Sequence, residues 1–198
     1  MPASSPQTQP VAMDDPWRSE AEAGSRNTTN HVVNHTDVDK IWFVVSPHNS
    51  LKDPHTLLNE HHRLHLVNIA IDDNPKFRAS NVEFTLPKPS YTIDTLTYLT
   101  EKFPFEKFSV IMGADSFQNI HRWKNYETLV ANYSFIVYNR PGFEIDDTFG
   151  ANVTLLDAPL LHISSTYIRK LIRDKKSIKY IVPGGVEEYI QENRYYTN

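Results

Sequence analysis

Apolar runs and helical patterns alternate along this chain of 198 residues. Continuous apolar runs are typical of strands covered on both faces, and alternating apolar and polar residues are typical of half-buried strands. Strands are predicted at residues 41–45, 82–86, 108–112, 134–138 and 153–156. Elsewhere apolar residues recur at helical spacing, and Thr92 is the expected cap of one helix. Helices are predicted at residues 56–71, from residue 92, around residues 123–129, and at about residues 165–175 and 185–193.

This alternation predicts a three-layer α/β fold. Strands that alternate with helices pair in parallel through right-handed crossovers, so helices cover both faces of one sheet. Ligands bind such sheets outside the carboxyl ends of the strands. Polar clusters follow three of the predicted strands, at residues 46–49, 113–116 and 139–142. We therefore expect the functional site at this edge of the sheet.

The first thirty or so residues differ from the rest in composition. They are rich in Pro, Ser, Thr and Asn, and Trp17 is their only large aromatic residue. Such a segment cannot bury enough apolar surface to offset its ordering entropy, so we expect it to be disordered.

Charge and cysteine content exclude several classes of function. The formal net charge is -4 and both signs are mixed along the chain, so no basic surface for nucleic acid or membranes is expected. The absence of cysteine excludes disulfides, thiolate metal sites and thiol nucleophiles. No apolar stretch has the length of a membrane span and no signal pattern opens the chain, so we expect a cytoplasmic protein.

Residues 163–169 have the pattern of an anion site. Three hydroxyl residues, Ser164, Ser165 and Thr166, open a predicted helix, and Arg169 follows one turn later. Free N–H groups at a helix start and the arginine fork both suit phosphate oxygens. On the local pattern alone, an ordinary hydroxyl cap with a solvated arginine is the better explanation.

A second polar loop contains His48 and Lys52, whose imidazole and ammonium groups suit a polyphosphate; a plain surface loop explains it equally well. The nearby His61, His62 and His65 lack the Glu that a zinc-protease motif requires, so no metal site is predicted.

Two further clusters suit a nucleotide. Asp115 follows a predicted strand and could accept ribose hydroxyls, while Trp123 could stack on a flat ring. Tyr91 and Thr92 stand at a helix start that could present N–H groups to a carboxylate. The alternatives are a capping Asp, a core Trp and an ordinary helix cap.

Order and spacing make these clusters specific when they are taken together. Residues 41–52, 90–96, 113–123, 139–142 and 163–169 resemble bacterial nicotinate-mononucleotide adenylyltransferases, and the resemblance extends from about residue 34 to 194. It implies a Rossmann-like nucleotidyltransferase fold and transfer of the adenylyl group of ATP to nicotinate mononucleotide, giving deamido-NAD and pyrophosphate. Magnesium normally accompanies the ATP. The substrate's own phosphate is the nucleophile, so the protein's task is positioning and charge stabilisation.

The resemblance also assigns the residues of the site. The ATP phosphates are assigned to Ser164, Ser165, Thr166, Arg169, Lys52 and His48. The nicotinate nucleotide is assigned to Tyr91, Thr92, Asp115, Trp123 and Arg140. Within this set, Tyr91 and Thr92 would meet the nicotinate carboxylate and Trp123 would stack on the pyridine ring.

The chain departs from the family at its start. The family has a first strand, a Gly-x-Phe-Asn-Pro-type loop and a His-x-Gly-His motif that binds the α-phosphate. Residues 24–35 contain no such motif, and His31 and His35 lack the intervening glycine, so no catalytic residue is assigned. We expect the first strand to be missing or replaced. Residues 1–33 are then a disordered or non-family segment, and residues 34–198 form a nucleotidyltransferase domain that is incomplete at its start.

Two explanations of this departure remain open. A mistaken or recombined reading of the gene is favoured, because the later motifs keep the residues that the chemistry would use. Otherwise the chain is an inactive or binding-only relative. Rival functions are a non-catalytic nucleotide-binding module and an adenylyltransferase for nicotinamide mononucleotide or phosphopantetheine. No nucleic-acid or membrane partner is expected, and a homo-oligomer is left open.

Overall fold

The computed structural model describes residues 11–12, 22–47, 58–157 and 163–197. Within these ranges one sheet of parallel strands has the order β3-β2-β1-β4-β5-β6. The strands are β1 (Val11–Ala12), β2 (Ile41–Val44), β3 (Phe77–Ser80), β4 (Ser109–Gly113), β5 (Ser134–Tyr138) and β6 (Asn152–Leu156). The order reverses between β1 and β4, and ligands of such sheets bind beside this switch point.

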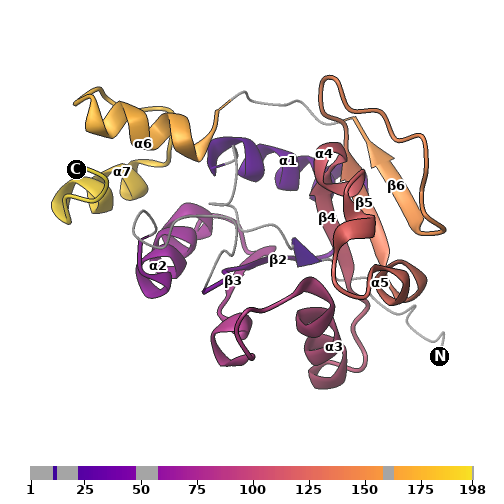
Figure 1. The fold of residues 1–198 in the computed structure, drawn as a ribbon. Coiled ribbons are helices and arrows are strands. Elements are labelled where there is room, and N and C mark those ends of the chain that lie inside the picture. Colours follow the sequence, from indigo (N-terminus) through magenta and orange to yellow (C-terminus); the bar gives the residue numbers. More distant parts are fainter. Residues whose placement is uncertain (1–10, 13–21, 48–57, 158–162, 198) are drawn as a thin grey trace, which may run out of the picture.

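Helices lie on both sides of the sheet (Figure 1). The α-helices are α1 (Glu22–His35), α2 (Glu60–Ile71), α3 (Thr92–Lys102), α4 (Ala114–Phe117), α5 (Tyr126–Asn132), α6 (Ser165–Arg173) and α7 (Gly184–Glu192). Two short 3-10 helices, η2 (Val82–Thr85) and η3 (Ile120–Arg122), complete the described elements. None of the helices in these ranges has the length and apolarity needed to cross a membrane.

Two hydrophobic cores fill the space between the layers. Ile41 and Phe43 of β2 pack into the first core with α1, α2, α6 and α7. We call this side of the sheet the α1 face. Trp42 and Val44 pack into the second core with α3, α4 and α5. We call this side of the sheet the α3 face. Successive strand residues point to opposite faces, so a continuous apolar run serves both cores. The predicted three-layer α/β fold is confirmed.

Strand β1 occupies the centre of the sheet. Val11 pairs with Trp42 on one side and Val110 on the other, and Ala12 pairs with Phe43 and Ile111. The sequence led us to expect that the first strand was missing or replaced. A strand of two residues stands in its position, so the centre of the sheet is not left open at these residues.

Helix α1 lies mostly within the segment for which we expected disorder or a non-family sequence. Thr28, Thr29, Val32 and Val33 are buried, and both valines pack into the core of the α1 face. Burial of these side chains offsets the conformational entropy that is lost when the helix becomes ordered. The composition of the segment did not indicate such burial. The helix crosses the expected boundary at residue 34, and the division of the chain there stays a prediction.

One predicted strand is wrong, and the helix predicted around residues 123–129 begins only at Tyr126, as α5. The alternation of residues 82–86 predicted a strand, but residues 82–85 form the 3-10 helix η2 and the strand β3 precedes it. The polar member of the pattern, Glu83, is buried rather than solvent-facing. Thr92 is also not a cap: Tyr91 holds the N-cap position of α3 without a side-chain hydrogen bond. Of the helix predicted at residues 56–71, residues 56–57 lie outside the described part.

Replacing Ala12 by proline tests the central strand. Proline removes an N–H from the ladder and is tolerated only at the edges of sheets. We expect Ala12→Pro to lower the free energy of unfolding by about 1–3 kcal/mol or more, measured by urea denaturation. Ala12→Gly keeps the N–H and should lose less. A proline variant as stable as the parent chain would show that β1 is not an inner strand.

Candidate active site

The start of helix α6 contains both a cap and an exposed polar pair. Ser164 is the N-cap, and its Oγ accepts a hydrogen bond from the N–H of Tyr167 at 3.0 Å. Ser165 is fully buried. Arg169 Nη2 donates to Thr166 Oγ1 at 3.3 Å. Ser164 therefore behaves as the ordinary cap that the local pattern favoured, whereas Thr166 and Arg169 form the part of this segment that can meet a ligand.

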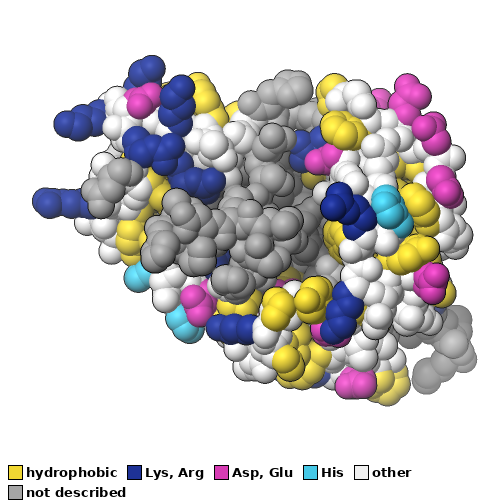
Figure 2. Space-filling model, in the orientation of Figure 1, with side chains coloured by type: hydrophobic (Ala, Val, Ile, Leu, Met, Phe, Trp, Pro, Cys, Tyr) yellow, Lys and Arg dark blue, Asp and Glu magenta, His cyan; other side chains and the backbone are white. Residues whose placement is uncertain are grey.

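Basic residues gather at the last turn of this helix and just after it. Lys170, Arg173, Lys175 and Lys176 are exposed along α6 and the turn that follows it. Figure 2 shows lysine and arginine side chains gathered over the end of the molecule where α6 lies, while acidic side chains lie along the opposite side of this view. The mixing of charges along the chain did not predict this local excess of positive charge, which favours a polyphosphate near α6.

The C-terminal tyrosines pack beside Arg169, and the sequence did not indicate this contact. The Arg169 guanidinium lies 5.9 Å from the ring centroid of Tyr196. The hydroxyl of Tyr195 lies 2.9 Å from His62 Nδ1. Burial, and then a hydrogen bond and charge interaction with Tyr189, raise the pKa of Tyr195. The contact of Tyr195 with His62 holds the C-terminal segment against α2, and the contact of Tyr196 with Arg169 holds it next to α6.

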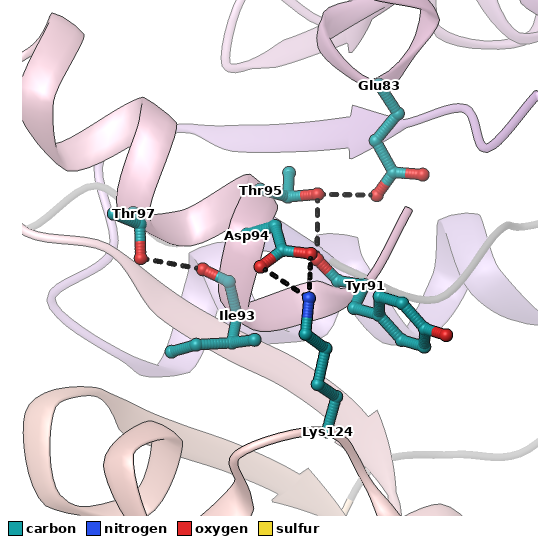
Figure 3. A network of polar contacts seen from close by, with 7 residues as sticks. All are labelled: Glu83, Tyr91, Ile93, Asp94, Thr95, Thr97 and Lys124. Carbon is teal, nitrogen blue, oxygen red and sulfur yellow. Dashed lines mark hydrogen bonds and ion pairs between the residues drawn. The ribbon is translucent and has the colours of Figure 1, made fainter. Parts of the chain in front are cut away.

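The start of helix α3 is tied to the segment that contains Trp123 (Figure 3). Lys124 Nζ donates to both carboxylate oxygens of Asp94 at 2.8 and 3.1 Å. The same ammonium lies 4.6 Å from the ring centroid of Tyr91. Trp123 is half-buried and packs against the core of the α3 face. The structure thus brings Tyr91, Thr92 and Trp123 into one region, and Lys124 is a residue of this region that the sequence did not single out.

A carboxylate and an arginine meet beyond the ends of β4 and β5. Asp115 Oδ1 lies 3.4 Å from Arg140 Nε, and Arg140 Nη2 donates to the hydroxyl of Tyr138 at 3.3 Å. Asp115 Oδ1 is buried and accepts no hydrogen bond from the residues that the structure describes. A Cβ at Gly113 would overlap this oxygen and lie 3.0 Å from Arg140 Nε. The glycine therefore permits the close approach of Asp115 and Arg140.

His48 and Lys52 lie outside the described residues, but both flanks of their segment are described. Arg63 of α2 is buried and donates from Nη2 to the carbonyls of Ser46 and Pro47, at 2.7 and 3.2 Å. Its Nε donates to the carbonyl of Leu58 at 2.9 Å. The Arg63 guanidinium thus holds together the two ends of residues 46–58. An arginine on the buried side of a predicted helix could have suggested such a role.

The histidines of α1 and α2 take part in ring contacts. The rings of His31 and His35 stack at 3.8 Å, His61 meets the edge of Phe84 and His65 the edge of Tyr189. In the described ranges, no group of three or more His, Cys, Asp or Glu side chains could hold a metal ion.

A cavity of about 480 Å³ lies beside the beginning of the segment predicted to bind an anion, since Ile163 lines it. Its walls include Arg26, Asn27, Asn30, Asp73, Asn74 and Ile163. Arg26 Nη2 donates to both carboxylate oxygens of Asp73 at 2.9 Å. These two wall residues therefore already pair with each other. None of the residues that the sequence assigned to a ligand lines the cavity.

Comparisons with known proteins identify the class. The family model described as cytidylyltransferase-like matches residues 24–171. A nicotinic acid mononucleotide adenylyltransferase of Plasmodium falciparum, complexed with NaAD, has the same fold with a TM-score of 0.78. That alignment covers 96% of this chain and 97% of the other, at 21% identity.

Curated relatives narrow the assignment. A probable nicotinate-nucleotide adenylyltransferase of Cytophaga hutchinsonii is 48% identical over 172 residues, which is 85% of this chain and 88% of the relative. A protein of the same name from Flavobacterium psychrophilum is 44% identical over 84% of this chain and 88% of the relative. The chain belongs to the cytidylyltransferase-like family and, within it, to the nicotinate-nucleotide adenylyltransferases.

Gly113→Ala tests the carboxylate–arginine cluster. The added methyl group must displace Asp115, so we expect the affinity for nicotinate mononucleotide to fall about tenfold, which calorimetry can measure. Crowding should also lower the free energy of unfolding by about 1–3 kcal/mol. Gly184→Ala is the matched control, because a Cβ there meets nothing within 4 Å. If the Gly113→Ala and Gly184→Ala variants bind nicotinate mononucleotide equally tightly, Asp115 and Arg140 do not belong to the site.

Proposed function

We propose that this chain transfers the adenylyl group of ATP to nicotinate mononucleotide, giving deamido-NAD and pyrophosphate. The observation that carries the proposal is the division of polar residues between the two faces of the sheet. Thr166 lies in the first turn of α6, which packs on the α1 face, and Arg169 follows about one turn later. Tyr91 and Trp123 belong to segments packed on the α3 face. Two substrates held by these groups would meet at the carboxyl edge between them.

The proposed assignment gives each group one task. Thr166 and Arg169, with His48 and Lys52, bind the ATP side, while Ser164 serves as the cap of α6 and Ser165 is buried. Tyr91, Thr92 and Trp123 bind the nicotinate ring and its carboxylate, and Asp115 and Arg140 line the pocket of that nucleotide. The relatives' shared name, the basic surface near α6 and the Lys124 contact beside Trp123 support this arrangement.

The chemistry needs no protein nucleophile. A phosphate oxygen of nicotinate mononucleotide forms a bond to the α-phosphorus of ATP, and the bond to the bridging oxygen of the leaving pyrophosphate breaks. Arg169 would neutralise negative charge that develops on the phosphates, and the two binding regions would align the reacting atoms.

A divalent metal generally accompanies ATP in such transfers, and we propose Mg²⁺. The described residues offer no carboxylate cage, which fits an ion that is bound mainly by phosphate and water. When bound, it supplies neutralisation of phosphate charge. A cytoplasmic location stays a prediction, and the oligomeric state stays open.

The missing His-x-Gly-His motif bears on the rate. Helix α1 reads Glu22–His35 without that motif. The loss of one donor to a developing charge lowers kcat by about 10²–10³. We therefore expect a slow enzyme, and the alternative is a relative that binds nucleotides without turnover.

Pyrophosphate release tests the proposed reaction. The chain is supplied with ATP, Mg²⁺ and nicotinate mononucleotide, beside a version in which residues 1–33 are replaced by a family-type strand and His-x-Gly-His segment. Faster release by the repaired version, and no release without the mononucleotide, is the expected result. Binding without release by either folded version would favour the non-catalytic alternative. Nicotinamide mononucleotide and phosphopantetheine serve as rival acceptors.

Arg169→Ala tests the ATP side. Loss of a guanidinium that pairs with phosphate should weaken ATP binding about tenfold or more, measured by calorimetry, with little change in nicotinate-mononucleotide affinity. Arg122→Ala is the control, because Arg122 is an exposed arginine of η3, which packs on the other face of the sheet. If both variants bind ATP equally, Arg169 does not contact the phosphates.

A further inference from the structure

A buried carboxylate lies beside the proposed nicotinate region, and no step of the proposed reaction uses it. Glu83 of η2 is only 6% exposed. Its Oε2 accepts a hydrogen bond from Ser90 Oγ at 2.6 Å, and its Oε1 accepts one from Thr95 Oγ1 at 2.8 Å. Each carboxylate oxygen thus has its own hydroxyl donor, and Figure 3 shows the bond from Thr95.

The two donors enclose the residues proposed to meet the nicotinate carboxylate. Ser90 directly precedes Tyr91, and Thr95 follows Thr92 within the first turn of α3. Thr95, which is fully buried, also lies with its Oγ1 3.3 Å from the Tyr91 carbonyl. A single carboxylate therefore fixes both ends of the Tyr91–Thr92 segment.

The energetics favour a positioning role over simple packing. A buried carboxylate is costly unless hydrogen bonds satisfy it, and an apolar residue would fill the same space without that cost. Hydrogen bonds to an ionised carboxylate are short and directional, so they fix the hydroxyl donors more tightly than neutral pairs do. On the other side of the same turn, Lys124 holds Asp94. The start of α3 is thus restrained from two directions.

We propose that Glu83 is a positioning residue for the nicotinate nucleotide. It holds Ser90 and Thr95 so that the backbone of Tyr91 and Thr92 keeps the conformation that the substrate carboxylate requires. Glu83 acts through these residues and does not touch the substrate. The inference rests on the proposed function and adds to it a residue outside the assigned site.

The test compares the affinities of full-length variants for the two substrates. Calorimetry with nicotinate mononucleotide and, separately, with ATP is carried out on the parent chain, Glu83→Ala, Glu83→Gln and Thr95→Val. Glu187→Ala on α7 is the matched control, since Glu187 accepts a hydrogen bond from Gln191 on the other face of the sheet. Thermal unfolding is followed for every variant.

The expected result is a selective loss. Glu83→Ala and Thr95→Val should weaken nicotinate-mononucleotide binding about tenfold, while ATP binding changes less than about twofold. Glu83→Gln should stay within about threefold of the parent, because a glutamine amide can still accept from one hydroxyl and donate to the other. Glu187→Ala should change neither affinity.

Three results would overturn the inference. If Glu83→Ala binds nicotinate mononucleotide as tightly as the parent chain, Glu83 has no positioning role. If folded Glu83 and Thr95 variants lose affinity for ATP and mononucleotide equally, the network supports only the fold. If the parent chain binds ATP but not nicotinate mononucleotide, the proposed function itself fails on the nicotinate side, and the role of Glu83 fails with it.

Discussion

The pairing of one central strand with both of its neighbours is the constraint on which this domain depends. Buried backbone groups without partners cost about 1–3 kcal/mol each, so an inner strand cannot be left out of a parallel sheet without a large loss of stability. The two residues of β1 bond to β2 and to β4. They also define the place where strand order reverses, beside which the two groups of site residues lie on opposite faces.

The sequence predicted the longer elements well, for a physical reason. Residues 134–138 form β5 as predicted, because a strand covered on both faces must be apolar throughout. Strand β1 is too short to show any periodicity. The segment of η2 misled the prediction, since Val82 and Phe84 alternate with Glu83 as in a half-buried strand. What buries Glu83 is a pair of hydroxyl groups farther along the chain.

The sequence predicted the main residues of the candidate site but not the residues that hold its segments in position. Asp115 and Arg140 meet as expected of residues at neighbouring strand ends, and Tyr91 lies close to the residue that follows Trp123. Arg63 and Lys124 were not singled out, because their partners lie 17 and 30 residues away. Such pairs depend on the folded topology, which local spacing does not reveal. Ser164 shows the opposite case, a predicted ligand residue whose hydroxyl caps a helix.

The central claim is that one nucleotide product spans the carboxyl edge of the sheet, from the start of α3 to the start of α6. A crystal structure of the chain with deamido-NAD tests it most directly. The account predicts the pyridine ring against Trp123, its carboxylate at Tyr91 and Thr92, and the phosphates beside Thr166 and Arg169. A product bound instead in the cavity beside Arg26 and Asp73, or with its pyridine ring away from Trp123, would contradict the account.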